Sequence, residues 1–456
     1  MKSYELEPTH ENLMKSFLAD TLGRNKDIFA FADILNSLED SCSIAIDGSW
    51  GSGKTFFVNQ VKMLLDANND FVSTMNEDDK AVILSQWKRF HKGESPEFQL
   101  HLSVYYDAWE NDNDEDPILS LIYAILKNAN DDFSIPNDAG FVKIAANILE
   151  FFTGKKWGDL IESFRSEGPL DKLKKEKAIE TEIRRFLDAL LEERGNRLVI
   201  FVDELDRCNP SYAVRLLERI KHYFSNDRIT FVFSVNTSEL QHTIKRYYGG
   251  AFDACRYLDR FFDLRMSIPP ADYNAYYRSI DFNKDTYLYD IMCHAVICKY
   301  NLSIREAGRY LRNAKMAAYE AVHDSGGRYS FAFADGKTTL FCLTYVVPIM
   351  LGLRIVDLQR YESFVNGKDP SPLVDFMDIQ DLFGFFLAGD ESYDNVSGCT
   401  VVTVKEKLKE VYDAIFNTNY GGDIYSKKIG QCGFDKQTKD TLLRVVSLFS
   451  KYTYID

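Results

Sequence analysis

The sequence lacks the patterns that identify zinc-binding, secreted and membrane-spanning proteins. Its eight cysteines form no CxxC pair and no zinc-ligand spacing, which predicts reduced thiols in a cytoplasmic protein. Residues 1–10 are polar and acidic, so we expect no secretory leader. The two most apolar stretches, 141–152 and 338–353, are shorter than the roughly 20 residues that a transmembrane helix requires. We therefore expect no membrane span.

Positive charge is also scarce relative to negative charge. The chain has 54 Lys and Arg residues against 69 Asp and Glu residues, a formal net charge of -15. This balance weighs against nonspecific nucleic-acid binding by the surface as a whole, although a local patch remains an alternative. The densest basic stretch, 172–185, interleaves glutamates at spacings that favour pairing within one helix, so we interpret it as a solvated helix face.

The segment 48–55 has the complete GxxxxGK[ST] pattern of a phosphate-binding loop. It lies between an apolar run at 43–47 and a helical pattern at 56–65, the context that the motif requires. Backbone N–H groups of such a loop converge on phosphate oxygens; here Lys54 would reach the β- and γ-phosphates and Thr55 would bind Mg²⁺. The motif predicts a nucleotide site, the alternative being an ordinary glycine-rich turn. The predicted cofactor-binding residues are Gly48, Ser49, Trp50, Gly51, Ser52, Gly53, Lys54 and Thr55.

Two carboxylates follow a second apolar run. Residues 198–202 form a β-branched and aromatic sequence typical of a strand covered on both faces, and Asp203 and Glu204 come directly after it. A P-loop enzyme needs a carboxylate at the end of a neighbouring strand to hold Mg²⁺, and Asp203 fits that role. Glu204 is then the candidate base for the attacking water. The alternative is that these acids only begin a loop.

A polar residue ends a third apolar run. The run covers 229–235, and Asn236 follows it. An amide at this point can sense the γ-phosphate or orient the attacking water. The alternative is that Asn236 caps the helix expected at 239–248, and both roles are compatible.

Several segments, taken in order, resemble the KAP family of P-loop NTPases. Their combined order is much more specific than the phosphate loop alone and covers residues from about 20 to 320. Two positions depart from the family pattern, because Glu204 and Asn236 stand where relatives often carry Asp. The similar segments are Asp20–Arg24, Gly48–Lys54, Tyr106–Glu110, Asp203–Cys208, Tyr257–Arg260 and a helix bearing Arg305, Arg309 and Arg312.

The resemblance implies an α/β fold of the P-loop NTPase type with an extra strand and a catalytic Glu. It also implies that Arg24 lies near the nucleotide base or phosphates. Soluble bacterial relatives resemble components of phage exclusion and antiphage defence, which implies homo-oligomers or separately encoded effector proteins as partners.

Charge compensation on a transferring phosphoryl group generally needs an arginine beyond the loop lysine. The candidates are Arg207 after the acidic strand, Arg260 near the last core strand, and Arg305 on a lid helix. For each one the alternative is a structural salt bridge.

The expected organisation has three parts. Residues 1–40 form a helical lead-in, 41–270 form the P-loop core, and 271–456 form a mainly helical lid or partner-docking region. The interval 110–197 is longer than one crossover requires, so we expect a largely helical insertion there. The core strands are expected at 43–47, 100–106, 198–202, 229–235 and 262–268.

The sequence therefore predicts an Mg²⁺-dependent ATPase that acts as a switch or motor in a complex. No Asn-Lys-x-Asp guanine signature is present, which favours ATP over GTP. Two other classes stay open: a nucleotide-gated scaffold with little turnover, and a nucleic-acid-stimulated remodelling ATPase.

Overall fold

The computed structural model describes residues 7–71, 75–93, 98–114, 116–129, 169–224, 226–319, 333–376, 401–417 and 427–447. Contacts divide the chain into two compact units, Glu7–Ala275 and a second unit that begins at Tyr276. The phosphate loop, Asp203 and Glu204 lie in the first unit. The expected lead-in at 1–40 falls within this unit as far as it is described.

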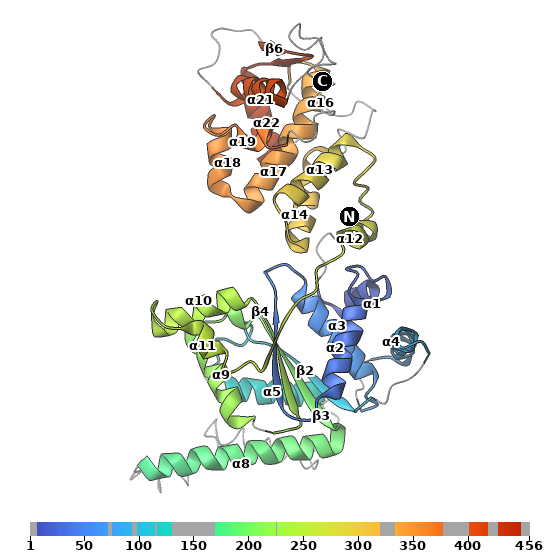
Figure 1. Ribbon diagram of the computed structural model, residues 1–456, viewed down its shortest axis with the longest axis vertical. Coiled ribbons are helices and arrows are strands. Elements are labelled where there is room, and N and C mark those ends of the chain that lie inside the picture. Colours follow the sequence, from blue (N-terminus) through green and yellow to red (C-terminus); the bar gives the residue numbers. More distant parts are fainter. Residues whose placement is uncertain are drawn as a thin grey trace. The chain divides into compact units, whose positions relative to one another are not determined.

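The first unit contains a five-stranded parallel sheet (Figure 1). The strand order is β2-β3-β4-β1-β5, so β4 lies between the strand before the phosphate loop and the strand before Asp203. This arrangement confirms the predicted fold with an extra strand, and each strand bound agrees with its expectation to within two residues. The strands are β1 (Cys42–Asp47), β2 (His101–Asp107), β3 (Arg197–Asp203), β4 (Ile229–Val235) and β5 (Leu264–Ser267).

The central strands are buried on both faces because their sequences are apolar on both. Every residue of β3 and β4 is buried. Alternate side chains point to opposite faces of a strand, so Ile200 and Phe233 join one core while Phe201 and Val232 join the other. β5 forms an edge of the sheet, and three of its four residues are exposed.

Helices cover the two faces of this sheet. One core is closed by α1 (His10–Leu18), α2 (Asn25–Ser37), α3 (Lys54–Ala67) and α4 (Glu77–Phe90). The opposite core is closed by α5 (Pro117–Ala129), α8 (Pro169–Arg194), α9 (Pro210–Tyr223), α10 (Thr237–Tyr248) and α11 (Ala254–Leu258). The described parts of the predicted insertion are thus helical, and the expected apolar stretch at 141–152 lies outside the described residues.

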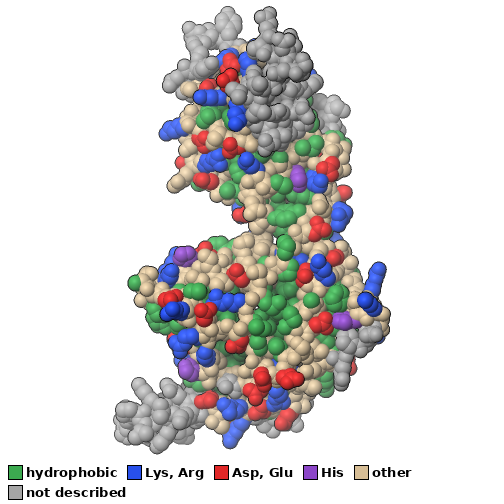
Figure 2. All heavy atoms as spheres, viewed as in Figure 1, with side chains coloured by type: hydrophobic (Ala, Val, Ile, Leu, Met, Phe, Trp, Pro, Cys, Tyr) green, Lys and Arg blue, Asp and Glu red, His purple; other side chains and the backbone are tan. Residues whose placement is uncertain are grey.

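The basic stretch of α8 pairs with its own glutamates. Arg184 Nη2 lies 3.4 Å from Glu180 Oε1, and Arg185 Nη1 lies 2.6 Å from Glu182 Oε1. These exposed pairs confirm the prediction of a solvated helix face at those positions. On the face shown in Figure 2, basic and acidic side chains are interspersed.

The second unit is mainly helical. A short antiparallel hairpin, β6 (Lys427–Ile429) and β7 (Cys432–Phe434), is the part of it that the sequence did not predict. Its larger helices are α13 (Leu288–Lys299), α14 (Ile304–Ala314), α16 (Gly336–Phe341), α17 (Val347–Val356), α18 (Leu358–Val365), α21 (Val401–Phe416) and α22 (Lys436–Ser447).

One helix of the second unit is longer than expected. A π-helical turn at Cys342–Val346 joins α16 to α17, giving a continuous helix of 21 residues, Gly336–Val356. The prediction that this apolar stretch is too short for a span is therefore wrong, since the helix is long and apolar enough by length and composition. However, 72% of its most apolar window is buried inside the structure, as in the core helix of a folded domain.

Gly23 shapes the junction between α1 and α2. Its φ of +66° is a backbone conformation that favours glycine, and an added Cβ would lie 2.8 Å from Asp272 Cβ. The backbone N–H of Asp272 also donates to Leu22 O at 2.9 Å. This junction fixes the start of α2, where Arg24 lies.

We expect Gly23→Ala to lower the thermal midpoint of the first unit. Gly93→Ala is the matched control, because Gly93 also has a positive φ, +92°, but its Cβ would meet nothing within 4 Å. Each variant should lose about 1–2 kcal/mol from backbone strain, and the clash with Asp272 should lower the midpoint of Gly23→Ala by a further 2 °C or so. Equal midpoints for the two variants, measured by calorimetry, would contradict this account of Gly23.

Candidate functional site

The phosphate loop connects β1 to α3. Gly53, the residue before α3, has a φ of +89°, and an added Cβ would lie 3.1 Å from Arg24 Nη1. The Ser52 hydroxyl is buried and has no hydrogen-bond partner within the described part of the chain. A backbone that curls in this way, with an unsatisfied hydroxyl inside it, fits a bound phosphate group.

Lys54 is folded back onto the loop. Its Nζ donates to Gly48 O at 2.5 Å and to Ser49 O at 3.2 Å, and the side chain is buried. Burial lowers the pKa of Lys54, while the carboxylates of Asp206 and Asp203 act in the opposite direction. The ammonium group therefore lies inside the loop, held by carbonyl groups that phosphate oxygens can replace.

Arg24 is hydrogen-bonded to the backbone of the phosphate loop. Its Nη1 donates to Ser52 O at 2.8 Å, and only 4% of the residue is exposed. Burial lowers the pKa of Arg24 to about 10. Arg24 thus contacts the phosphate loop itself, and its predicted proximity to the nucleotide base or phosphates stays a prediction.

Asp203 lies at the buried carboxyl end of β3. Its Oδ2 accepts a hydrogen bond from the Tyr105 hydroxyl at 3.1 Å, and its Oδ1 accepts one from the backbone N–H of Glu204 at 3.0 Å. In the sheet register it lies opposite Asp107, the last residue of β2. These contacts fix the carboxylate at the edge of the sheet where the phosphate loop begins.

Mg²⁺ would be held at this edge by few protein ligands. In the described residues, no group of three or more His, Cys, Asp and Glu side chains lies close enough to hold a metal ion. Mg²⁺ in P-loop sites needs only one or two protein oxygens, because phosphates and water complete its shell. Thr55, half-buried at the start of α3, and Asp203 fit that donor set.

Glu204 has a strained backbone and a charged partner. Its φ of +59° is unusual for a residue with a side chain, and such outliers gather at functional sites. Its Oε2 lies 2.6 Å from Arg207 Nε. Burial and the neighbouring Asp203 raise the pKa of Glu204 to about 7, while Arg207 acts in the opposite direction. A carboxylate with this pKa can exchange a proton near neutral pH.

Asp206 joins three segments of the site. Its Oδ2 accepts from Trp50 Nε1 at 2.6 Å, and its Oδ1 accepts from the backbone N–H of Asn236 at 3.1 Å. The Thr243 hydroxyl of α10 donates to its backbone carbonyl at 3.1 Å. The phosphate loop, the end of β3 and the end of β4 are therefore tied together by one buried residue.

Asn236 is the N-cap of α10. Its Oδ1 accepts from the backbone N–H of Glu239 at 3.4 Å, so the capping interpretation is confirmed. The same segment is tied to β1, because the N–H of Thr237 donates to Asp47 Oδ1 at 2.7 Å. A role for the Asn236 amide toward water or phosphate stays a prediction.

The three predicted arginines lie in different surroundings. Arg207 is in the site, where it contacts Glu204. Arg260 is exposed just after α11, and its carbonyl accepts a hydrogen bond from Lys221. Arg305 is exposed on α14, which belongs to the second unit. Of these three arginines, only Arg207 contacts Glu204 in the described part of the first unit.

Sequence reasoning missed the roles of Asp206, Asp47 and Tyr105. Asp47 ends β1, so its signal was an acid at the carboxyl end of a parallel strand, whereas Tyr105 bonds Asp203 across 98 positions of sequence. The bond between Asp206 and Trp50 spans 156 positions of sequence and left no local signal.

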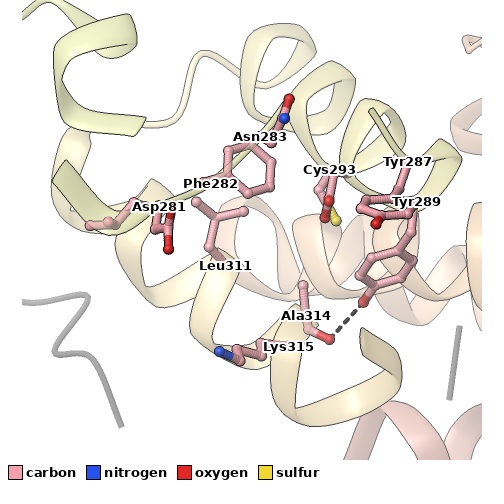
Figure 3. Close-up of a pocket in the computed structure, with 11 residues that line it drawn as sticks. Asp281, Phe282, Asn283, Tyr287, Tyr289, Cys293, Leu311, Ala314 and Lys315 are labelled. Atoms are coloured by element: carbon pink, nitrogen blue, oxygen red, sulfur yellow. Dashed lines mark hydrogen bonds between the residues drawn. The ribbon is translucent and has the colours of Figure 1, made fainter. Parts of the chain in front are cut away.

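A separate pocket of about 270 Å³ lies in the second unit (Figure 3). Asp281, Tyr287, Tyr289, Cys293 and Lys315 are among the residues that line it. The Tyr289 hydroxyl donates to Ala314 O at 2.6 Å at its edge. The pocket has no glycine-rich loop and contains none of the predicted site residues.

Comparisons with known proteins agree with this geometry. A family model described as "KAP family P-loop domain" matches residues 24–287, more than half of the 456 residues. A search of curated proteins finds no match. Among solved structures, the ORC2 protein of Aeropyrum pernix in its ADPNP and ADP complexes has a TM-score of 0.31 and 13% identity, covering 86% of this chain and 95% of that chain. So low a TM-score supports no further argument.

We expect Asp206→Asn to destabilise the first unit and weaken nucleotide binding. An amide can accept from only one of the two donors, so the other is left unsatisfied at a cost of about 1–3 kcal/mol. Asp253→Asn is the matched control, because Asp253 caps α11 and Asn caps helices equally well. Thermal unfolding and titration with ATP test both variants, and an Asp206→Asn protein that resembles the control in both would contradict the joining role of Asp206.

Proposed function

Because the chain belongs to the KAP family of P-loop NTPases, we propose that it binds ATP with Mg²⁺ and hydrolyses it to ADP and phosphate. The observation that carries the proposal is the 2.6 Å bond between Trp50 of the phosphate loop and Asp206 after β3. This bond brings the phosphate loop to the carboxylates Asp203 and Glu204, although their strands are not neighbours in the sheet.

Each residue of the site has a chemical role in this proposal. Lys54 turns from the carbonyls of Gly48 and Ser49 to the β- and γ-phosphates. Thr55 and Asp203 would hold Mg²⁺, which when bound would neutralise charge on the phosphates. Glu204 takes a proton from the water that attacks the γ-phosphorus, as the bond from that phosphorus to the ADP oxygen breaks.

Hydrolysis in this proposal drives a switch or motor in a cytoplasmic complex. Asn236 and Thr237 lie where β4 ends, beside both the phosphate loop and α10, so movement of the loop can reach the helices. By analogy with soluble bacterial KAP proteins, the biological role is antiphage defence with separately encoded effector proteins.

A nucleotide-gated scaffold with little turnover is the second candidate. The ion pair between Glu204 and Arg207 favours it, because Arg207 occupies one oxygen of the carboxylate and opposes the rise in the pKa of Glu204. The interspersed charges of Figure 2 give no support to the third candidate, a nucleic-acid-stimulated ATPase.

We expect Lys54→Ala to abolish ATP binding, and Glu204→Gln to retain binding but lose turnover by about 10²–10⁴-fold. Lys62→Ala is the matched control, because Lys62 also lies on α3 but pairs with Asp66 at 2.6 Å. Phosphate release with Mg²⁺ and ATP, with GTP and with added DNA tests these variants. Tight, Lys54-dependent binding with no turnover would favour the scaffold, and stimulation by DNA would favour the remodelling ATPase.

We further propose that Arg260 acts on the site of a neighbouring copy in a homo-oligomer. Arg260 is exposed, and no side-chain partner is found for it among the described residues. Arg260→Ala should lose turnover, whereas Arg256→Ala, an exposed neighbour on α11, should not. Mixing Arg260→Ala with Glu204→Gln should restore part of the activity, since a mixed interface combines an intact base with an intact arginine. No recovery on mixing would contradict action between copies.

A further inference from the structure

Arg207 lies close to two tryptophan rings. Its guanidinium carbon is 5.9 Å from the centre of the Trp50 ring and 5.5 Å from that of the Trp109 ring. Its Nε lies 2.6 Å from Glu204 Oε2. The three partners come from three segments of the chain: the phosphate loop, the segment after β2, and Glu204, the N-cap of the 3₁₀ turn Leu205–Arg207.

The tryptophans do not serve the hydrophobic core. Trp50 is 47% exposed and Trp109 is 51% exposed, whereas Trp87 of the same unit is 2% exposed. Indoles that face water bury little apolar surface, but their faces attract a guanidinium. The Trp50 indole is oriented by its Nε1 bond to Asp206, and the backbone N–H of Trp109 donates to Asp107 Oδ1 at 3.0 Å. Both indoles are therefore carried by segments fixed at the carboxyl edge of the sheet.

This arrangement constrains one oxygen of Glu204. Arg207 occupies Oε2, which leaves Oε1 to accept a proton from water. A guanidinium is planar and presents its donors in a fixed geometry, so a guanidinium that contacts two rings as well as a carboxylate restricts the orientation of that carboxylate. Because Trp50 belongs to the phosphate loop, a contiguous set of contacts runs from that loop through Arg207 to Glu204.

We propose that Arg207 is a positioning residue that aligns Glu204 for the attacking water, and that Trp50 and Trp109 hold it in place and couple it to the phosphate loop. This inference rests on the proposed hydrolysis of ATP. It assigns Arg207 to the base of its own chain, in place of direct contact with the transferring phosphoryl group.

Steady-state kinetics of Arg207 variants test the proposal. We expect Arg207→Ala to lower kcat by 10- to 100-fold and to change the Kd for ATP by less than twofold, because the alignment of Glu204 matters to the reaction and not to binding. Arg207→Lys keeps the charge but not the planar group, so it should recover less than a third of the lost kcat. Trp109→Ala should lower kcat as well, and the double variant should be no slower than Arg207→Ala alone.

Arg219→Ala is the matched control. Arg219 also combines an ion pair, 2.9 Å from Asp116 Oδ2, with a ring, 5.9 Å from the centre of Tyr223, but it lies outside the site. The control should leave kcat unchanged. Circular dichroism identifies any variant that fails to fold, and in that case Arg207→Lys decides the question.

Tryptophan fluorescence separates this inference from the proposed function. Addition of ATP with Mg²⁺ should change the emission of the wild type, and the change should shrink in both Arg207→Ala and Trp109→Phe. If the wild type hydrolyses ATP but Arg207→Ala matches it in kcat, the inference is wrong and the proposed function stands. If the wild type binds ATP without turnover, the proposed hydrolysis fails, and an undiminished signal in Arg207→Ala would also overturn the coupling.

Discussion

The site depends on the two hydrogen bonds that the buried carboxylate of Asp206 accepts. In the sheet, β4 lies between β1 and β3, so one strand separates the phosphate loop from Asp203 and Glu204. Asp206 spans this separation, because one of its oxygens binds Trp50 of the loop and the other binds the backbone of Asn236. Because only 6% of Asp206 is exposed, its carboxylate has little access to water as a substitute donor. The parallel sheet places strand ends at one edge, and Asp206 joins them into one site.

The edge of the sheet carries both a buried ammonium group, Lys54, and crowded carboxylates, Asp203 and Glu204. Such a site suits a ligand that has negative groups and a bound cation. Burial and the proximity of Asp203 hold the pKa of Glu204 above its ordinary value, and burial lowers that of Lys54. Phosphate groups would offset the positive charge of Lys54, and Mg²⁺ would offset the negative charge of the carboxylates. A site with crowded carboxylates and a buried ammonium is therefore completed electrostatically by a nucleotide with its metal ion.

Much of the fold was predictable because its signals are local. The strands before the loop and before Glu204 are continuous apolar runs in the sequence. The partner of Arg207 was not predictable, because here Glu204 and Arg207 meet across a 3₁₀ turn that follows a positive φ at Glu204, and neither feature has a signal in the sequence. The length of the helix Gly336–Val356 was also missed, since a π-helical turn carries it through a proline. The roles of Arg305 and Arg260 stay predictions, because each depends on another unit or another copy of the chain.

The most direct test of the account is a calorimetric titration of ATP into the wild type and Lys54→Ala, each with and without Mg²⁺. The account predicts one site per chain that requires Lys54 and binds more tightly when Mg²⁺ is present. Equal binding by the two proteins, or binding by neither, would contradict the assignment of residues 48–55 as the nucleotide site.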